Sequence, residues 1–219
     1  MTSSETDQRG LQMKTLLQVN ASLNGAASQS SRLADVFVAR WREAHPQSQV
    51  TVRDVAGEAV PHLTAERFQA FITKPDERTA DQRTIVAYSD TLVGELQRAD
   101  VIVLALPMYN FGVPSTLKAY FDHVARAGVT FNYSAQGPVG LLTGKKAVVI
   151  ATRGGLYAGT PKDTQTAYVR DFLAFLGIAD VEFVYAEGLA ISPGTKEAAL
   201  TGAHAQIEAL TQEEWKRAA

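Results

Sequence analysis

The sequence predicts an α/β fold of the doubly wound type, with a five-stranded parallel sheet and helices on both faces. Short apolar runs alternate with amphipathic helical patterns about five times along the chain. This alternation is typical of parallel strands that are joined by right-handed crossover helices. The chain has 219 residues, of which 46% are hydrophobic and 20% charged. That composition is sufficient for one hydrophobic core.

The first half of the chain predicts three helices and two strands. The apolar run at the start and the later alternating run are typical of strands, whereas apolar residues on one side of a charged segment indicate a helix. In chain order, we expect a strand over 15–19, a loop over 20–27, a helix that begins near Ser28, a strand over 50–54, a short helix over 65–72 within the otherwise irregular segment 55–76, and a long helix over 79–98.

The second half predicts three further strands, each followed by a helix, and a small hairpin. Pro114 fits the first turn of its helix, because the missing N–H would have no partner there. We expect a strand over 100–106, a helix over 116–126, a hairpin from 128–133 through Gly137 and Pro138, a strand over 146–151, a helix over 164–176, a strand over 181–186 and a helix over 196–217.

The domain organisation follows from what the sequence lacks. No internal repeat or low-complexity linker divides the chain. We therefore expect a single domain over residues 14–219, preceded by a flexible polar leader over residues 1–13. The leader has no apolar segment of the kind found in signal peptides.

Charge and residue types exclude several classes of function. The formal net charge is −2, so we expect neither nucleic acid nor a membrane as a partner. The chain has no cysteine, which excludes disulfides and is compatible with the reducing cytoplasm, the location that we expect. No apolar run approaches the roughly 20 residues of a membrane span. The four histidines are scattered without metal-ligand spacing, so no metal site is expected.

The loop after the first predicted strand is rich in hydroxyl and amide groups. It holds Ser22, Ser28, Gln29 and Ser30, with no Lys or Arg between Asn20 and Ser31. Because a helix N-terminus attracts anions, this loop suits a terminal monophosphate that is held by uncharged donors. The glycine-rich patterns of Walker and Rossmann loops are absent. The alternative interpretation is that Ser28 only caps the helix.

Two further loops follow the predicted third and fourth strands of the sheet. The first contains Met108, Tyr109, Asn110 and Phe111, and its rings suit a flat heteroaromatic ligand unless they are core residues. The second is 152–155, whose paired glycines permit a positive φ or a close approach of the backbone. Arg153 could neutralise an anion or hold a carboxylate elsewhere in the fold. A plain turn is the alternative for this segment.

The expected position of these loops favours a ligand site. In the flavodoxin-like strand order 2-1-3-4-5, the first, third and fourth strands are neighbours, and ligands bind at the carboxyl edge of the sheet. A phosphate at the first loop and a ring at the other two is the arrangement of a bound flavin mononucleotide (FMN). An enzyme of the α/β-hydrolase type is disfavoured because the sequence has no Gly-x-Ser-x-Gly motif.

These segments resemble those of the bacterial FMN-dependent NADH-azoreductases, also described as FMN-dependent NADH:quinone oxidoreductases, of the flavodoxin-like superfamily. The resemblance runs from about residue 14 to the C-terminal helix. It is strongest in Ser28-Gln29-Ser30, Pro107 to Lys118, Ala125 to Phe131, Arg153-Gly154-Gly155 and Ala186-Glu187-Gly188.

The resemblance implies a set of binding residues and a homodimer with the flavin at the subunit interface. Ser22, Ser28, Gln29 and Ser30 are implied to hold the FMN phosphate. The implied contacts of the flavin ring come from Pro107, Met108, Tyr109, Asn110, Phe111, Thr152, Arg153, Gly154 and Gly155. Tyr133 and Phe175 match aromatic positions that line the substrate side in the family. No side chain is implied as an obligatory acid or base.

The implied activity is a two-electron transfer from NADH or NADPH to quinones and aromatic azo compounds by a ping-pong mechanism. The protein's part in such a reaction is to bind, orient and tune the flavin. The leading alternative is an electron carrier of the flavodoxin type, and a further one is an NADPH-dependent FMN reductase. Carriers are strongly acidic, so the net charge of −2 argues against the first alternative, as does the extra segment 55–76.

Overall fold

The computed structural model describes residues 14–212, and the predicted polar leader over 1–13 lies outside the described residues, as do residues 213–219. Five parallel strands form the central sheet in the order β2-β1-β3-β6-β7. They are β1 (Thr15–Asn20), β2 (Gln49–Asp54), β3 (Val101–Pro107), β6 (Lys146–Thr152) and β7 (Asp180–Ala186). This order agrees with the predicted 2-1-3-4-5, because a separate hairpin takes the labels β4 and β5.

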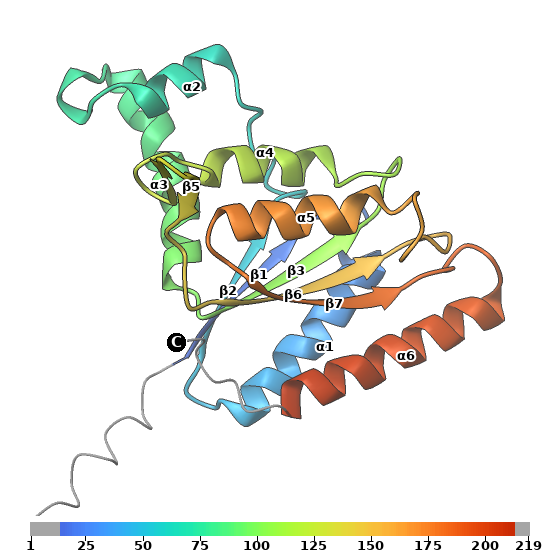
Figure 1. Ribbon diagram of the computed structural model, residues 1–219. Helices are drawn as coiled ribbons and strands as arrows, with labels where there is room; N and C mark the ends of the chain where they lie inside the picture. Colours follow the sequence, from blue (N-terminus) through green and yellow to red (C-terminus); the bar gives the residue numbers. More distant parts are fainter. Residues whose placement is uncertain (1–13, 213–219) are drawn as a thin grey trace, which may run out of the picture.

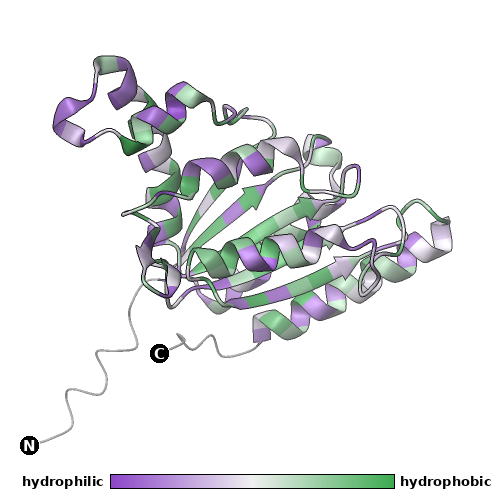
Figure 2. Cartoon of the chain, turned by 45° about the horizontal axis from the view of Figure 1, so that its top comes forward, coloured by the Kyte–Doolittle hydropathy of each residue, from purple (hydrophilic) through white to green (hydrophobic). Residues whose placement is uncertain are grey.

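Five helices pack on the sheet, and Figure 1 shows which face each one covers. On one face lie α1 (Gln29–Ala44) and α6 (Pro193–Gln212). On the other lie α3 (Ala80–Arg98), α4 (Ser115–Val124) and α5 (Thr164–Phe175). The buried side chains form two clusters, one on each side of the sheet. Figure 2 shows hydrophobic residues along the strands between them, as expected for parallel strands that are covered on both faces.

Alternate residues of β3 supply the two core clusters. Ile102 and Leu104 pack with the helices α3, α4 and α5, whereas Val101 and Val103 pack with α1 and α6. This follows from the two-residue period of a strand, which sends successive side chains to opposite faces. Every residue of β3 is apolar and buried, so the centre of the sheet offers no polar side chain from this strand on either face. The polar groups of the predicted site therefore come from the loops at the strand ends.

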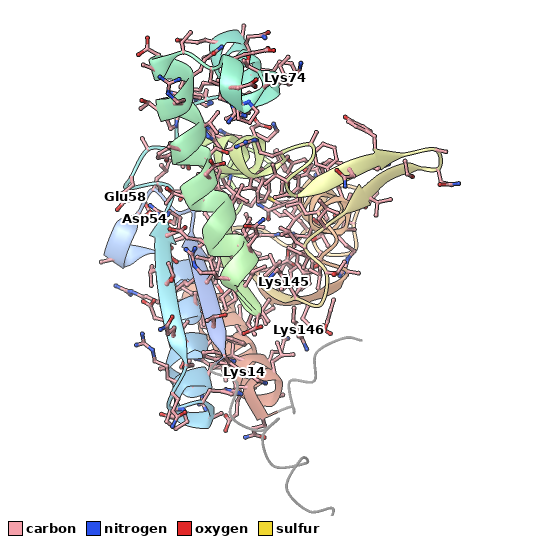
Figure 3. The ribbon with its side chains drawn as sticks, turned by 90° about the vertical axis from the view of Figure 1, so that its left-hand side faces the viewer. Lys14, Asp54, Glu58, Lys74, Lys145 and Lys146 are labelled. Carbon is pink, nitrogen blue, oxygen red and sulfur yellow. The ribbon has the colours of Figure 1, made fainter. Side chains whose placement is uncertain are left out.

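The predicted short helix over 65–72 is present as α2 (Ala65–Ile72), followed by the 3-10 turn η3 (Pro75–Glu77). Figure 3 shows α2 beside the end of α3, beyond the sheet. Thr79 begins α3 with a capping box, in which its hydroxyl accepts the N–H of Gln82 and the Gln82 side chain accepts the N–H of Thr79. The segment that leads to α2 is held by His123, whose Nε2 lies 2.9 Å from the carbonyl oxygen of Pro61.

Several predicted boundaries are wrong. The helix expected over 116–126 is α4 and ends at Val124, because the N–H of Arg126 donates to Oγ1 of Thr130 instead of continuing the helix. Pro114 is the N-cap of α4, one residue before the first turn. The hairpin begins later than expected, as β4 (Phe131–Ser134) and β5 (Gly137–Gly140).

The last predicted helix, over 196–217, is α6 and begins three residues earlier, at Pro193. Its predicted end lies outside the described residues. Within residues 14–212, no helix combines the length and the apolar character needed to cross a lipid bilayer. The same part of the chain contains no group of three or more His, Asp or Glu side chains placed to hold a metal ion.

Candidate functional site

The loops that follow β1, β3 and β6 meet at one edge of the sheet. The strand register pairs Asn20 with Ala105 and Pro107 with Thr152, so the carboxyl ends of these strands lie side by side. The backbone joins two of the loops directly, because the N–H of Met108 donates to the carbonyl oxygen of Thr152 at 3.0 Å. The structure therefore brings the three predicted loops together.

The loop after β1 places three buried hydroxyl groups near the start of α1. Ser22, Ser28 and Ser30 are 5%, 2% and 0% exposed. Oγ of Ser28 accepts the N–H of Ser31 at 3.2 Å and lies 3.0 Å from Oγ of Ser30. Ser28 is therefore the helix cap that the alternative interpretation required, and it also belongs to a hydroxyl pair at the helix N-terminus. Gln29 lies beside this pair and is half-buried.

The loop after β3 contains a tight turn with an unusual backbone. Tyr109 and Gly112 exchange two hydrogen bonds, from N–H of Tyr109 to O of Gly112 at 3.2 Å and from N–H of Gly112 to O of Tyr109 at 2.9 Å. Between them, Asn110 and Phe111 have φ angles of 50° and 63°. Two left-handed residues in succession are typical of a type I′ turn, in which glycine is preferred. A residue with a Cβ costs roughly 1–2 kcal/mol in this conformation.

The aromatic side chains of this turn are not core residues. Phe111 is 53% exposed, and Tyr109 is half-buried. The hydroxyl of Tyr109 lies 3.1 Å from Oγ of Ser22 and accepts the N–H of Leu23 at 3.1 Å. Tyr109 thus connects the turn to the loop after β1.

Arg153 holds carboxylates within its own chain, the second of the two roles that the sequence allowed. Its side chain is fully buried and forms ion pairs with Asp163 at 2.9 Å and Glu187 at 3.0 Å. It also donates to Oγ1 of Thr166 at 2.9 Å. Burial by itself raises the pKa of Asp163, but the hydrogen bonds from Arg153 and Thr166 outweigh burial and hold the pKa below its ordinary value. The two terminal nitrogens of the guanidinium are therefore engaged within the scaffold, whereas its buried Nε has no hydrogen-bond partner in the described part of the chain.

The glycines after Arg153 serve close approach and not a positive φ. Neither Gly154 nor Gly155 is among the residues with a positive φ. A Cβ on Gly155 would lie 2.7 Å from the ring of Tyr157. The Tyr157 ring in turn meets the Phe111 ring edge-on, with their centroids 5.6 Å apart. The loop after β6 is therefore packed against the turn after β3.

Glu187 and the first turn of α5 also belong to this edge, although neither was among the predicted site residues. One carboxylate oxygen of Glu187 accepts the N–H groups of Tyr157 and Ala158, both at 2.9 Å. Asp163 is the N-cap of α5 and accepts the N–H of Thr166. An Asp before an amphipathic helix is a readable cap signal, but its pairing with Arg153 depends on the tertiary fold.

A cleft opens between the turn, the loop after β1 and the start of α4. Its volume is about 690 Å³, within the usual range for small-molecule sites. No Lys, Arg, Asp or Glu is among its lining residues. The cleft is lined by Leu23, Met108, Tyr109, Asn110, Val113, Pro114, Ser115 and Thr116.

The structure does not bring Tyr133 and Phe175 to this cleft. Both contact the ring of Phe131, with centroid distances of 5.3 Å and 4.4 Å, and Tyr133 is 78% exposed on the hairpin. Phe175 ends α5, whereas Gln165 at the other end of that helix contacts Pro107. With a rise of 1.5 Å per residue, the two ends of α5 are about 15 Å apart. The two rings lie together, but away from the other predicted site residues.

Comparisons with known proteins agree with this architecture. Residues 13–211 match the model of the family described as having a flavodoxin-like fold. The chain is 54% identical over 196 residues to an FMN-dependent NADH:quinone oxidoreductase of Cellvibrio japonicus, covering 90% of this chain and 98% of the relative. It is 51% identical over 197 residues to FMN-dependent NADH:quinone oxidoreductase 6 of Burkholderia lata, covering 90% and 100% of the two chains.

Solved structures give the same result. An azoreductase from Bacillus anthracis superimposes with a TM-score of 0.83 at 30% identity, covering 91% of this chain and 99% of that one. An FMN-dependent NADH-azoreductase from the same species, solved in complex with FMN, has a TM-score of 0.81 at 25% identity and covers 91% and 100%. The chain therefore belongs to the flavodoxin-like fold family and, within it, to the bacterial FMN-dependent NADH:quinone oxidoreductases and azoreductases.

Proposed function

We propose that this protein is an FMN-dependent oxidoreductase that transfers two electrons from NADH or NADPH to quinones and aromatic azo compounds. The names of its relatives support this proposal. The observation that carries it is the hydroxyl of Tyr109, which joins the hydroxyl-rich loop after β1 to the turn after β3. These loops offer a place for the phosphate and a place for the ring of one ligand.

The start of α1 fits the phosphate of FMN. The hydroxyl groups of Ser28 and Ser30 are buried and 3.0 Å apart. The N–H groups of Gln29 and Ser30 stand in the first turn of α1, where a helix offers no intrahelical acceptor. Uncharged donors together with the helix dipole stabilise a dianion at such a position. We propose that Ser22, Ser28, Gln29 and Ser30 bind the phosphate.

The turn after β3 and the loop after β6 fit the flavin ring. In the described part of the chain, the N–H groups of Asn110 and Phe111 have no hydrogen-bond partner, so they are free to donate to a ring heteroatom. Bound FMN would supply the redox chemistry. Fixed N–H donors would stabilise negative charge on the bound ring without any rearrangement. We propose ring contacts from Pro107, Met108, Tyr109, Asn110, Phe111, Thr152, Gly154 and Gly155, with Arg153 fixing the backbone of the second loop.

A homodimer accounts for the position of Tyr133 and Phe175. Within one chain, Phe175 lies about one length of α5, roughly 15 Å, from Gln165, which contacts Pro107 at the site edge of the sheet. The hairpin that carries Tyr133 projects from the body of the molecule (Figure 3). It exposes 78% of Tyr133 and 52% of Val139, and Leu141 just after it is 42% exposed. We propose that this apolar surface packs on a second copy and brings Tyr133 and Phe175 to the substrate side of the partner's cleft.

The ping-pong order and the location are also parts of the proposal. A single cleft of this volume suits a reaction in which the electron donor binds and leaves before the electron acceptor binds. Tyr109 is the only titratable side chain among the residues that line the cleft, and its hydroxyl is engaged with Ser22 and Leu23. Water, or Tyr133 from a second copy, would therefore supply protons. The absence of cysteine from the chain suits the cytoplasm.

Rapid mixing tests the function and the order together. The purified protein is expected to be yellow and to release FMN on heating. Mixing it with NADH in the absence of an acceptor should bleach the flavin absorbance, and menadione added afterwards should restore it. Bleaching that requires menadione would exclude the ping-pong order. A protein that binds FMN but does not oxidise NADH with menadione would be a carrier, which is the leading alternative.

A further inference from the structure

We propose that Gln165 is a positioning residue, which braces the left-handed turn at Asn110 and Phe111 and thereby sets the affinity of the cleft for FMN. This inference rests on the proposed function. Gln165 lies in the first turn of α5 and is 0% exposed. Its Nε2 donates to the carbonyl oxygens of Pro107 at 3.0 Å and Gly112 at 3.2 Å. One amide group therefore holds the backbone on both sides of the turn.

The turn requires such support because its conformation is unfavourable for the residues that form it. Asn tolerates a positive φ, but Phe111, at 63°, lacks the freedom of glycine. Such residues persist only where the surrounding structure holds them, and they gather at functional sites. A second side chain of α5 contributes, since Oγ1 of Thr164 donates to the carbonyl oxygen of Phe111. The first turn of α5 thus holds three carbonyl groups of residues 107–112.

The first turn of α5 is itself fixed. Its N-cap, Asp163, accepts the N–H of Thr166 at 3.0 Å and pairs with the buried Arg153 at 2.9 Å. Because Arg153 belongs to the loop after β6, the position of Gln165 is tied to that loop. The first turn of α5 therefore sets the distance between the two loops that would frame the flavin ring.

The unpaired carbonyl oxygen of the Gln165 side chain argues that this residue does more than fill space. Oε1 of Gln165 is buried and has no hydrogen-bond partner in the described part of the chain. A buried acceptor without a partner is unfavourable, so a position that only fills space is better served by an apolar side chain of the same size. An amide at this position is explained by its two donated hydrogen bonds. Methionine is the matching apolar substitution, because it keeps the length and removes the donors.

The test compares Gln165→Met with Gln69→Met, a control on the exposed surface of α2. In the apoprotein, Gln165→Met should speed hydrogen exchange at the N–H of Gly112 at least about tenfold, because this group closes the turn by donating to Tyr109. In a fluorescence titration, its dissociation constant for FMN should rise about tenfold. The Gln69→Met protein should match the wild type in both measurements. If Gln165→Met also matches the wild type in either one, the inference is overturned.

A double substitution tests whether Gln165→Met weakens FMN binding because the turn loses its support. Glycine adopts the left-handed conformation without a steric cost, so Phe111→Gly removes the need for a brace. In that background, Gln165→Met should raise the dissociation constant for FMN by less than about threefold. An equal effect in both backgrounds would overturn the inference, because it would show that Gln165 acts on something other than the strained backbone.

Two further results keep the inference and the proposed function apart. Should Gln165→Met not fold, Thr164→Val at the exposed edge of the turn removes one brace and should weaken FMN binding about threefold, and no change would overturn the inference. Suppose that the wild-type protein takes up no FMN while Gln165→Met still accelerates exchange at Gly112. The proposed function, and with it the effect of Gln165 on FMN affinity, would then fall, whereas the bracing of the turn by Gln165 would stand.

Discussion

The hydroxyl of Tyr109 lies 3.1 Å from Oγ of Ser22, so one aromatic side chain joins the loop after β1 to the turn after β3. The same hydroxyl accepts the N–H of Leu23. Ser22 belongs to the proposed phosphate site and Tyr109 to the proposed ring site. The two halves of the proposed cofactor site are therefore joined in the free protein, which would lower the ordering cost of binding.

Removal of this hydroxyl should weaken FMN binding. Tyr109→Phe loses the contacts with Ser22 and Leu23 but keeps the ring. A hydrogen bond of this kind contributes about 0.5–1.5 kcal/mol, so the dissociation constant for FMN should rise about two- to thirteenfold in a fluorescence titration. Tyr168→Phe is the matched control. It removes the same hydroxyl group from a ring that packs against Phe121 on α4 and does not line the cleft. Equal dissociation constants for Tyr109→Phe and the wild type would contradict this prediction.

The ion pairs of Arg153 should matter for stability far more than a surface pair does. Arg153→Met leaves the carboxylates of Asp163 and Glu187, 7% and 13% exposed, without their cation. Breaking a buried pair from one side costs about 3–5 kcal/mol, which urea unfolding at pH 7 would measure. Arg40→Met removes an exposed pair with Glu208 and should cost less than about 1 kcal/mol. Similar losses for both variants would show that the network contributes little.

The protein should lose stability below pH 6.5 because of His123. Burial lowers the pKa of His123 below its ordinary value of 6.5, and this outweighs the opposing hydrogen bond with Pro61. The unfolded chain therefore binds a proton more readily than the folded one. The contribution of His123 to stability is full above pH 6.5 and falls as the pH decreases below that value, by at most about 1.4 kcal/mol per pH unit.

Urea unfolding at several pH values between 5 and 8 tests this dependence. His123→Gln keeps an N–H donor near Pro61 and removes the titrating ring. The slope of the unfolding free energy against pH, between 5 and 6.5, should be smaller in this variant than in the wild type. An unchanged slope would mean that other groups cause the acid sensitivity.

Two glycine substitutions should change stability in opposite directions. A Cβ at Gly140 would lie 2.0 Å from the backbone nitrogen of Gly177, so Gly140→Ala must push the hairpin away from the end of α5. Overpacking of this kind costs about 1–3 kcal/mol or more. Gly202 lies within α6, and a Cβ added there would point into open space. Gly202→Ala should therefore stabilise the protein by about 0.5–1 kcal/mol. Thermal unfolding that ranks these variants the other way would refute the packing argument.

Much of the fold was predictable because its causes are local. The helix over 65–72 was predicted with the bounds that the structure has, since its apolar positions repeat with a helical period. Ser28 was recognised as a helix start from its residue type. The end of α4 was predicted two residues too late, because the contact of Arg126 with Thr130 that ends this helix depends on how the following turn folds back.

The site was predictable in outline and not in its internal connections. The paired glycines at 154 and 155 allowed either a positive φ or a close approach of the backbone, and the structure shows the close approach. The left-handed residues are instead Asn110 and Phe111, which the turn and α5 hold in place. Arg153 looked equally suited to an anion or to a carboxylate. Only the tertiary structure shows that it binds carboxylates, those of Asp163 and Glu187.

Hydrophobic periodicity and helix caps were thus sufficient to predict which segments form strands and helices, whereas the order of the sheet and the edge where the loops meet were predicted from the flavodoxin-like strand order. Such signals act between residues that are close in the chain. The tertiary structure was needed to show that Tyr109 reaches Ser22, that Gln165 holds Pro107 and Gly112, and that Tyr133 lies away from the cleft of its own chain. These contacts join residues that are far apart in sequence, and only the packing of helices on the sheet brings them together.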